Sequence, residues 1–424
     1  MKLLLVHNYY QQRGGEDVVF EAEAALLEEH GHHVLQYVAR NEALVEASAW
    51  TVGRQAVWNG TTYADLRRLL QRERPAVVHV HNTLPVISPA VFYAVRSAGV
   101  PVVQTLHNYR LLCPSATLFR DGKVCEDCLH RSIAVPAVRH GCYRGSRSAS
   151  GVVAAMLALH HLAGTWKHNV DLFIALTEFA RAKFVEGGLP GERIVVKPNF
   201  APDAGLARTG GDYALFVGRL SGEKGVKPLL EAWRRLGDRI RLRVIGDGPE
   251  APLVSAAVRA GLAVDFLGWQ TPDVVATAMA GARFLVFPST WYEPFGLGII
   301  EAYAAGLPVL ASDIGGLSEL VKHRNTGLQV RAGDVDHLVQ QVEWALSHPD
   351  AMRTMGVNAR GEYEARYTPG RNYHLLIAAY QRALRQRSHA GSLSYDSVSG
   401  GAFPVGAPRG QAVASSDGQP PVGS

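Results

Sequence analysis

The sequence predicts an α/β protein with two similar domains in series, each a doubly wound parallel sheet facing the other across a cleft. Short apolar runs that suit buried strands alternate with segments of helical periodicity. The alternation stops at residues 198–211, which are rich in Pro, Ala and Gly, and then resumes. The 424 residues are 47% hydrophobic, which is enough chain and apolar surface for two cores.

The first half opens with a strand at Leu3–His7, a glycine loop at 13–16 and a helix at Asp17–His30. Its other strands are expected at Val34–Val38, Val77–Val80, Val102–Leu106, Asp171–Leu176 and Ile194–Val196. Helical stretches separate these runs, so the strands should be parallel. We assign this domain to residues 1–203, with a cysteine-rich insertion at about 108–147.

The second half, residues 204–368, repeats the alternation. Its strands are expected at Tyr213–Gly218, Leu242–Ile245, Val264–Leu267, Phe284–Phe287 and Pro308–Ala311. Its helices are expected at Val226–Leu236, Glu250–Ala260, Leu297–Ala305 and Val335–Ser347. A ligand should bind at the carboxyl ends of the strands. Residues 388–424 are rich in Gly, Ser and Pro, and are predicted to be a disordered tail.

Composition excludes several classes of protein. No run of about 18 apolar residues exists, so no transmembrane helix is expected. The apolar run at residues 3–6 is too short for a signal-peptide core of about 7–15 residues, so a cytoplasmic location is expected. The net charge of +5 suits an anionic substrate or a membrane surface without indicating either. No nucleic-acid partner is expected.

Two loops of the second half carry candidate anion-binding groups. In Phe216–Gly225, a strand leads into a glycine-rich loop with Arg219 and Lys224, which could hold phosphate oxygens or be ordinary solvated charges. In Pro288–Ala302, Glu293 precedes a helix start near Gly296, whose free amides could receive a phosphate. The carboxylates of Glu293 and Glu301 would suit hydroxyl-rich groups on either side of that phosphate. Both could instead simply be helix-surface charges.

With seven residues between Glu293 and Glu301, the chain resembles the retaining glycosyltransferases of family 4 (group 1), which have the GT-B fold. The resemblance covers nearly all of residues 1–387. The motifs that carry it, besides the two glutamates, are Gly14-Gly15, Thr105–Asn108, Gly218-Arg219, Glu223–Gly225, Gly246–Pro249 and Ser312–Glu319. Any one of these is weak, but their combination in this order is specific.

The resemblance implies a role for each residue of the donor site. Arg219 and Lys224 would bind the donor diphosphate, where two cations can substitute for a metal ion. Glu301 would bind the ribose, and Glu293 would contact the transferred sugar. The amides of Phe295, Gly296 and Leu297 would close on sugar and phosphate, and Gly15 would approach from the first domain.

His107 would lie near the anomeric carbon and assist transfer with retained configuration, although a lone histidine at a strand end is often a structural hydrogen bonder. The helix at 369–387 would return to the first domain. No cofactor is expected to be required for catalysis.

Two motifs compete with this interpretation. Gly246–Ala251 matches a dinucleotide fingerprint after a strand, but it follows the second strand of its domain, and Pro249 lacks an amide. We therefore interpret Gly246 as part of the nucleotide pocket wall. Asp334-Val335-Asp336 has the spacing of a metal site in other sugar transferases, but it precedes a helical run, so Asp334 is predicted to be a helix cap.

All four cysteines fall within one short stretch: Cys113, Cys125, Cys128 and Cys142. Four thiolates could form a structural zinc site, with the Cys-x-x-Cys turn as one half. The nearby His107, His130 or His140 could replace a thiolate. Free thiols or a redox pair are the alternatives, and disulfides are disfavoured in a reducing cytoplasm.

Residues 129–170 contain no acidic residue but several Arg and His. The same segment includes an apolar stretch at Val152–Trp166. We interpret the apolar stretch as a core helix and the basic loop as a candidate acceptor side, at the inner face of a membrane. The predicted activity is hexose transfer from a UDP- or GDP-linked sugar to a glycan or lipid-linked acceptor. The alternatives are an epimerase or hydrolase of nucleotide sugars with the same fold, and a non-catalytic sugar-binding protein.

Overall fold

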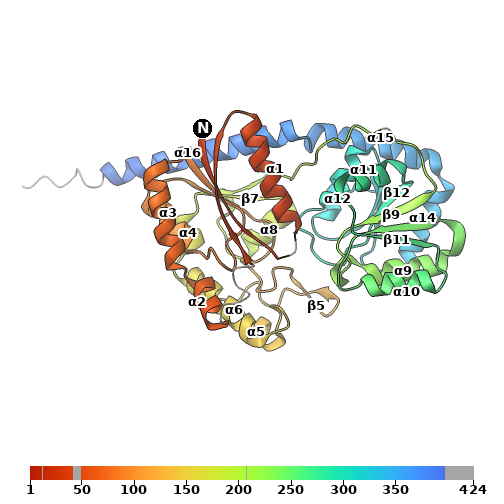
Figure 1. Cartoon of the computed structure of the whole chain (residues 1–424), viewed down its shortest axis with the longest axis horizontal. Helices are drawn as coiled ribbons and strands as arrows, with labels where there is room; N and C mark the ends of the chain where they lie inside the picture. The colour runs from red at the N-terminus through yellow and green to blue at the C-terminus, as the bar shows by residue number, and fades with distance from the viewer. Residues whose placement is uncertain (12, 42–48, 207, 397–424) are drawn as a thin grey trace, which may run out of the picture.

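The computed structural model describes residues 1–11, 13–41, 49–206 and 208–396. They form two α/β domains side by side (Figure 1). Each domain contains one six-stranded sheet whose paired strands are all parallel. The predicted fold class is therefore confirmed.

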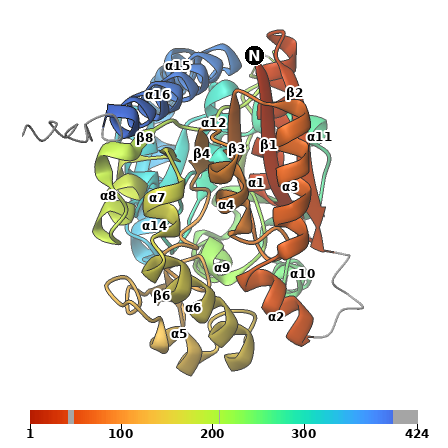
Figure 2. The same ribbon diagram turned by 90° about the vertical axis from the view of Figure 1, so that its left-hand side faces the viewer.

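The N-terminal domain contains the first sheet and the insertion. Its elements are β1 (Lys2–Tyr9), α1 (Gly15–Glu29), β2 (His33–Arg40), α2 (Ala49–Val57), α3 (Gly60–Glu73), β3 (Val77–Val80), α4 (Ala90–Ser97), β4 (Val102–Thr105), β5 (Phe119–Arg120), β6 (Lys123–Val124), α5 (Val135–His140), α6 (Arg147–Leu162), α7 (Thr165–Asn169), β7 (Leu172–Ala175), α8 (Glu178–Glu186), η2 (Gly191–Arg193) and β8 (Ile194–Val196). The hairpin β5–β6 and helix α5 project away from α16, at the opposite end of the domain (Figure 2).

The C-terminal domain contains the second sheet. Its elements are β9 (Tyr213–Val217), η3 (Gly222–Lys224), α9 (Val226–Leu236), η4 (Gly237–Arg239), β10 (Arg241–Ile245), α10 (Ala251–Arg259), β11 (Val264–Gly268), α11 (Pro272–Gly281), β12 (Phe284–Phe287), α12 (Leu297–Ala304), β13 (Val309–Ser312), α13 (Leu317–Leu320), β14 (Gly327–Val330), α14 (Val335–Ser347), α15 (Pro349–Arg366) and α16 (Pro369–Asp396).

The strand orders locate the binding edge of each sheet. The second sheet has the order β11-β10-β9-β12-β13-β14. Successive strands are added on one side of β9 as far as β11 and then on its other side from β12, so the switch point lies between β9 and β12. The first sheet, β2-β1-β3-β4-β7-β8, has its switch point between β1 and β3. In open parallel sheets a ligand binds beyond the carboxyl ends of the strands, at such a switch point.

Helix α16 packs against the N-terminal domain although it follows the C-terminal one. Leu376, Ala379, Tyr380 and Ala383 share a buried cluster with residues of β1, α1 and β7. The helix continues to Asp396, nine residues beyond the end that the sequence predicted, and the rest of the predicted tail lies outside the described residues. Within the described residues, no helix combines the length and apolarity needed to cross a bilayer.

Two local predictions are confirmed. The side chain of Asp334 caps α14 by accepting a hydrogen bond from the His337 amide at 2.8 Å. Helix α6 is a core helix, since Val153, Met156 and Leu157 on one face belong to the buried core cluster of the domain. The predicted stretch is not one helix, however, because the chain turns at Gly164 and Trp166 lies in α7.

Candidate functional site

The loops after β9 and β12 touch each other at the switch point of the second sheet. Gly225 has a φ of 75°, and a Cβ there would lie 2.0 Å from the carbonyl oxygen of Pro288, so this approach requires glycine. The amide of Thr290 donates to the carbonyl of Glu223 at 2.8 Å. The two sequence motifs with the candidate charges are thus brought together by tertiary contact.

Lys224 and Glu293 form an ion pair at this point. The ammonium contacts Oε1 of Glu293, which also accepts a hydrogen bond from Ser289 at 3.0 Å. Glu293 is only 3% exposed, whereas the side chain of Lys224 is 21% exposed. The ammonium also lies 5.5 Å from the ring of Trp291. A buried carboxylate therefore holds a partly exposed cation at the crevice, as a paired charge rather than an isolated one.

Arg219 and Gly246 border the same edge of the sheet. The side chain of Arg219 is exposed and makes no ion pair with any described residue. Gly246 has a φ of 144°, and a Cβ there would lie 1.8 Å from the carbonyl oxygen of Gly218. The loops after β9 and β10 therefore pack backbone to backbone, and Arg219 is available to an anionic ligand.

Helix α12 begins beside these loops. Its N-cap is Gly296, which has no side chain to satisfy the first free amides, and Phe295 is buried just before it. Burial raises the pKa of Glu301, which lies in the second turn. No described residue donates a hydrogen bond to that carboxylate, so it keeps its capacity to accept one from a ligand hydroxyl.

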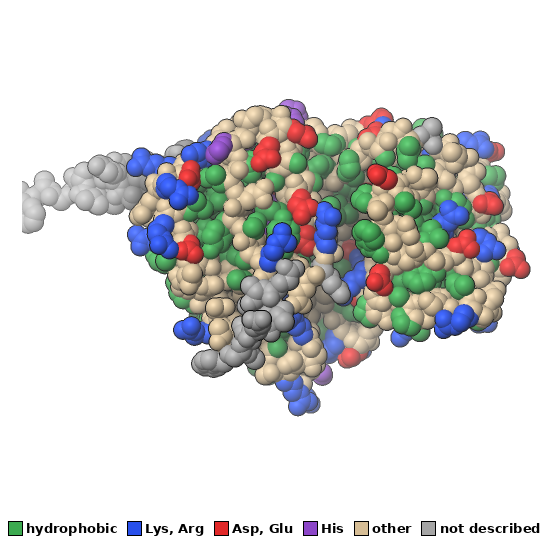
Figure 3. Space-filling model, viewed as in Figure 1, with side chains coloured by type: hydrophobic (Ala, Val, Ile, Leu, Met, Phe, Trp, Pro, Cys, Tyr) green, Lys and Arg blue, Asp and Glu red, His purple; other side chains and the backbone are tan. Residues whose placement is uncertain are grey.

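The N-terminal domain approaches the start of α12 directly. A Cβ on Gly15, the first residue of α1, would lie 3.2 Å from Cδ1 of Leu297. Nearby, the carboxylate of Glu319 accepts hydrogen bonds from the amides of Glu178 and Phe179 at the start of α8. The surface is hollowed between the two domains, and Lys and Arg side chains lie at the border of this hollow (Figure 3). The contacts place Gly15 and the second-domain residues on one crevice.

His107 follows β4 at the corresponding edge of the first sheet. It is 9% exposed, and its Nε2 lies 2.9 Å from Nδ1 of His81. Burial lowers the pKa of His107 to about 3, so the imidazole is neutral at neutral pH. It lines a cavity of about 40 Å³ together with Arg110 and Trp166.

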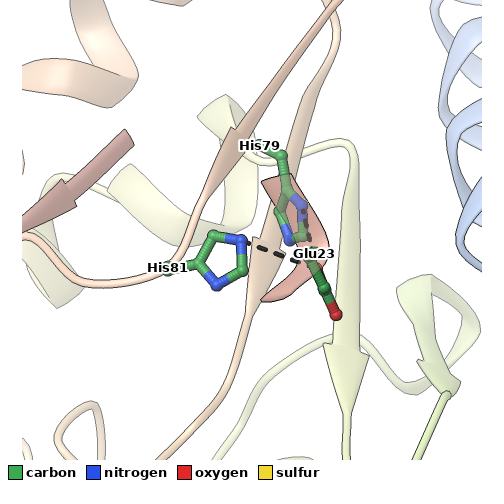
Figure 4. Close-up of side chains that lie close together, drawn as sticks. All are labelled: Glu23, His79 and His81. Atoms are coloured by element: carbon green, nitrogen blue, oxygen red, sulfur yellow. Dashed lines mark ion pairs between the residues drawn. The ribbon is translucent and has the colours of Figure 1, made fainter. Parts of the chain in front are cut away.

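Behind His107 lies a buried cluster that the sequence did not reveal. Glu23 Oε2 is 3.8 Å from Nδ1 of His79 and 3.7 Å from Nε2 of His81 (Figure 4). The geometry alone could suit a metal ion. However, the ammonium of Lys197 lies 2.6 Å from the other oxygen of Glu23 and already compensates its charge. We interpret the cluster as a network that orients His81 and, through it, His107.

The four cysteines converge as well. Cys113, Cys125, Cys128 and Cys142 all line one cavity in the insertion. The histidines that could have replaced a thiolate are not among its lining residues: His130 pairs instead with Glu186, and His107 belongs to the other cavity.

Two family models match consecutive parts of the chain. Residues 14–199 match the glycosyl transferase 4-like domain, and residues 200–362 match the glycosyl transferases group 1. The boundary between the two matches falls in the segment between β8 and β9.

Glycosyltransferases are among the relatives with similar sequences. An uncharacterised glycosyltransferase of Methanocaldococcus jannaschii is 33% identical over 36% of this chain and 40% of its own length. The 2-deoxystreptamine glucosyltransferase of Streptomyces kanamyceticus is 28% identical over 70% of this chain and 75% of that protein. The chain spans less than half the length of the first two curated relatives that it matches.

The structure of Anabaena HepE with UDP and glucose superposes with a TM-score of 0.63 at 20% identity, covering 90% of this chain and 99% of that one. Together with the two consecutive family matches, this likeness extends over both sheets. The chain therefore belongs to the group 1 glycosyl transferases and has their two-domain GT-B fold.

Proposed function

We propose that the protein is a retaining glycosyltransferase. It moves a hexose from a UDP- or GDP-linked sugar to a hydroxyl of a glycan or lipid-linked acceptor, in the synthesis of a cell-surface polysaccharide. The observation that carries the proposal is the meeting of Lys224, Glu293 and the start of α12 at the switch point of the second sheet. A binding site for an anionic leaving group beside a sugar-binding carboxylate is what this reaction requires.

The cations stabilise the leaving group in this proposal. Cleavage of the bond to the anomeric carbon leaves negative charge on the diphosphate. Lys224, Arg219 and the amides at the start of α12 can surround that charge without reorganising, because each is fixed to a loop that the sheet holds. They take the place of a divalent metal.

The two glutamates hold the groups on either side of the diphosphate. Glu301, half-buried and without a hydrogen-bond donor among the described residues, accepts from the ribose hydroxyls. Glu293 accepts from hydroxyls of the sugar, and its carboxylate keeps the Lys224 ammonium beside the diphosphate. Gly15, close to Leu297, admits the backbone of the first domain to the diphosphate, where a side chain would fill the space.

The donor is proposed by analogy with neighbouring structures. HepE has been solved with UDP and with UDP-glucose, and a Streptomyces relative is named a glucosyltransferase. We therefore expect UDP to stabilise this protein against heat. A ligand at about 100 times its Kd contributes about 2.7 kcal/mol, a readily measured rise in Tm. Thermal unfolding with UDP, GDP, UDP-glucose and a GDP-hexose measures it.

A transfer assay then distinguishes the activities. A transferase releases nucleoside diphosphate faster when acceptor is added, and the anomeric configuration of the product, read by NMR, tests retention. Equal consumption of donor without acceptor would favour the hydrolase or epimerase. Absence of any Tm shift with all four ligands would contradict the proposal.

A surface of the insertion that carries both basic and apolar side chains suits a lipid-linked acceptor. Ile133 and Val135 are 56% and 59% exposed, and exposed Arg131 and Arg139 flank them. Apolar side chains inserted among anionic headgroups, with about 1 kcal/mol from each nearby Arg, give reversible membrane binding.

We expect the protein to sediment with vesicles of anionic phospholipid at low salt and to be released at high salt. The double variant Ile133→Asp/Val135→Asp should lose most of this binding. Val357→Asp, which changes an exposed valine of α15, is the matched control and should retain it. Equal sedimentation of both variants would exclude this surface.

A further inference from the structure

The four cysteines of the chain come from three separate places in the insertion. Cys113 follows β4, Cys125 and Cys128 form a turn after β6, and Cys142 follows α5. Their side chains nevertheless line one cavity, with Arg120 and three other residues. None forms a disulfide, and Cys113 and Cys128 are buried. Cysteines that only fill space in a core have no reason to line one small cavity together.

We propose that this cavity is a structural zinc site with four thiolate ligands. Its volume of about 10 Å³ matches about one water-sized sphere. Zinc takes four thiolates in a tetrahedron at about 2.3 Å, which suits ligands that converge from several directions. No three of the sulfur atoms lie within 4.8 Å of one another, so rotation of the cysteine side chains must draw them onto the ion.

The surroundings of the sulfur atoms suit bound thiolates. The amide of Asp127 donates to Cys125 and that of Ala137 donates to Cys128. Such outer contacts orient ligands and spread their charge. Four thiolates on one Zn²⁺ carry a net charge of −2. Arg120 lines the cavity beside that charge, and its guanidinium also pairs with Asp127 at 2.9 Å.

The site would tie the insertion to the donor loop. Glu126 lies inside the Cys-x-x-Cys turn and forms an ion pair with Lys183 of α8 at 2.8 Å. The same ammonium lies 5.7 Å from the ring of Tyr292, which precedes Glu293 in the loop after β12. A metal that holds the turn rigid thereby holds a contact between the N-terminal domain and the donor loop.

Elemental analysis of the full chain, purified without chelator, tests the site. We expect one zinc ion per chain, retained through gel filtration, and its release when an organic mercurial titrates the thiols. Cys128→Ser should lower the zinc content to below half. Ser132→Ala, which changes an exposed serine of the insertion that does not line the cavity, is the control and should keep full content.

A cobalt spectrum covers the case in which Cys128→Ser does not fold. The wild-type chain, grown with or exchanged into Co²⁺, should show the visible bands and thiolate-to-metal charge transfer of tetrahedral cobalt bound to sulfur. Zinc-free wild-type protein with four titratable thiols would overturn the proposal. So would a Cys125–Cys128 disulfide in protein kept free of reductant, which would indicate a redox pair. Full zinc content in folded Cys128→Ser would overturn it too.

Discussion

Replacing Lys224 with alanine should lower kcat/KM for sugar transfer by about 10²–10³-fold, the usual effect of removing one fixed donor to charge that develops in a transition state. The ammonium lies at the switch point, held there by the buried carboxylate of Glu293 and flanked by the ring of Trp291. Water that replaces the ammonium must reorganise as the diphosphate departs, and the barrier rises accordingly. Steady-state kinetics with a saturating acceptor measure the change.

The variant also leaves the 3% exposed Glu293 without its cation, so its thermal unfolding must be measured beside its activity. Lys227→Ala is the matched control: the same residue type three positions on, with a 73% exposed side chain. We expect it to transfer at the wild-type rate. A folded Lys224→Ala enzyme within about twofold of that rate would show that the diphosphate does not depend on this cation.

Most strands could be predicted because their signal is local. Residues 77–80, 194–196 and 284–287 are short apolar runs between breakers, and each is a strand with the predicted bounds. The end of α16 could not be predicted in this way. Once a helix is nucleated, each further residue adds one hydrogen bond, so it can extend into a segment whose composition alone favours disorder.

The candidate site shows the same limit. Spacing and resemblance indicated Lys224 and Glu293 as donor-site residues, but not that they pair with each other, because 69 residues separate them. Glu23 and Lys197 are 174 residues apart and carried no motif. The one available signal was His79-Val80-His81: two histidines on one face of a strand too buried to solvate them, which requires partners from other elements.

The largest effect in the N-terminal domain should come from His107. Changing it to alanine is expected to lower kcat/KM by about 10²-fold, the low end of the range for a positioned side chain that handles a proton. The low end is appropriate because burial holds the pKa of His107 at about 3. The ring therefore hydrogen-bonds as a neutral group at working pH and is a weak base.

The pH profile separates this role from a structural one. An imidazole is neutral above its pKa, so His107 should not titrate between pH 5.5 and 8. Over this range the pH profiles of the wild-type enzyme and of His107→Ala should therefore have the same shape. An inflection near pH 6.5 that disappears in the variant would contradict the neutral imidazole. His33→Ala, an exposed histidine of β2 in the same sheet, is the control and should leave the rate unchanged.

Glutamine at position 107 tests what the imidazole supplies. His107→Gln should recover part of the rate lost in the alanine variant, because its amide can still hydrogen-bond to His81. His81 lies 3.7 Å from the carboxylate of Glu23, which the ammonium of Lys197 holds in turn. Equal, near-complete loss in both variants, with unchanged Tm and donor affinity, would mean that transfer needs the ring as a base. The network around Glu23 would then have to tune proton affinity rather than orientation alone.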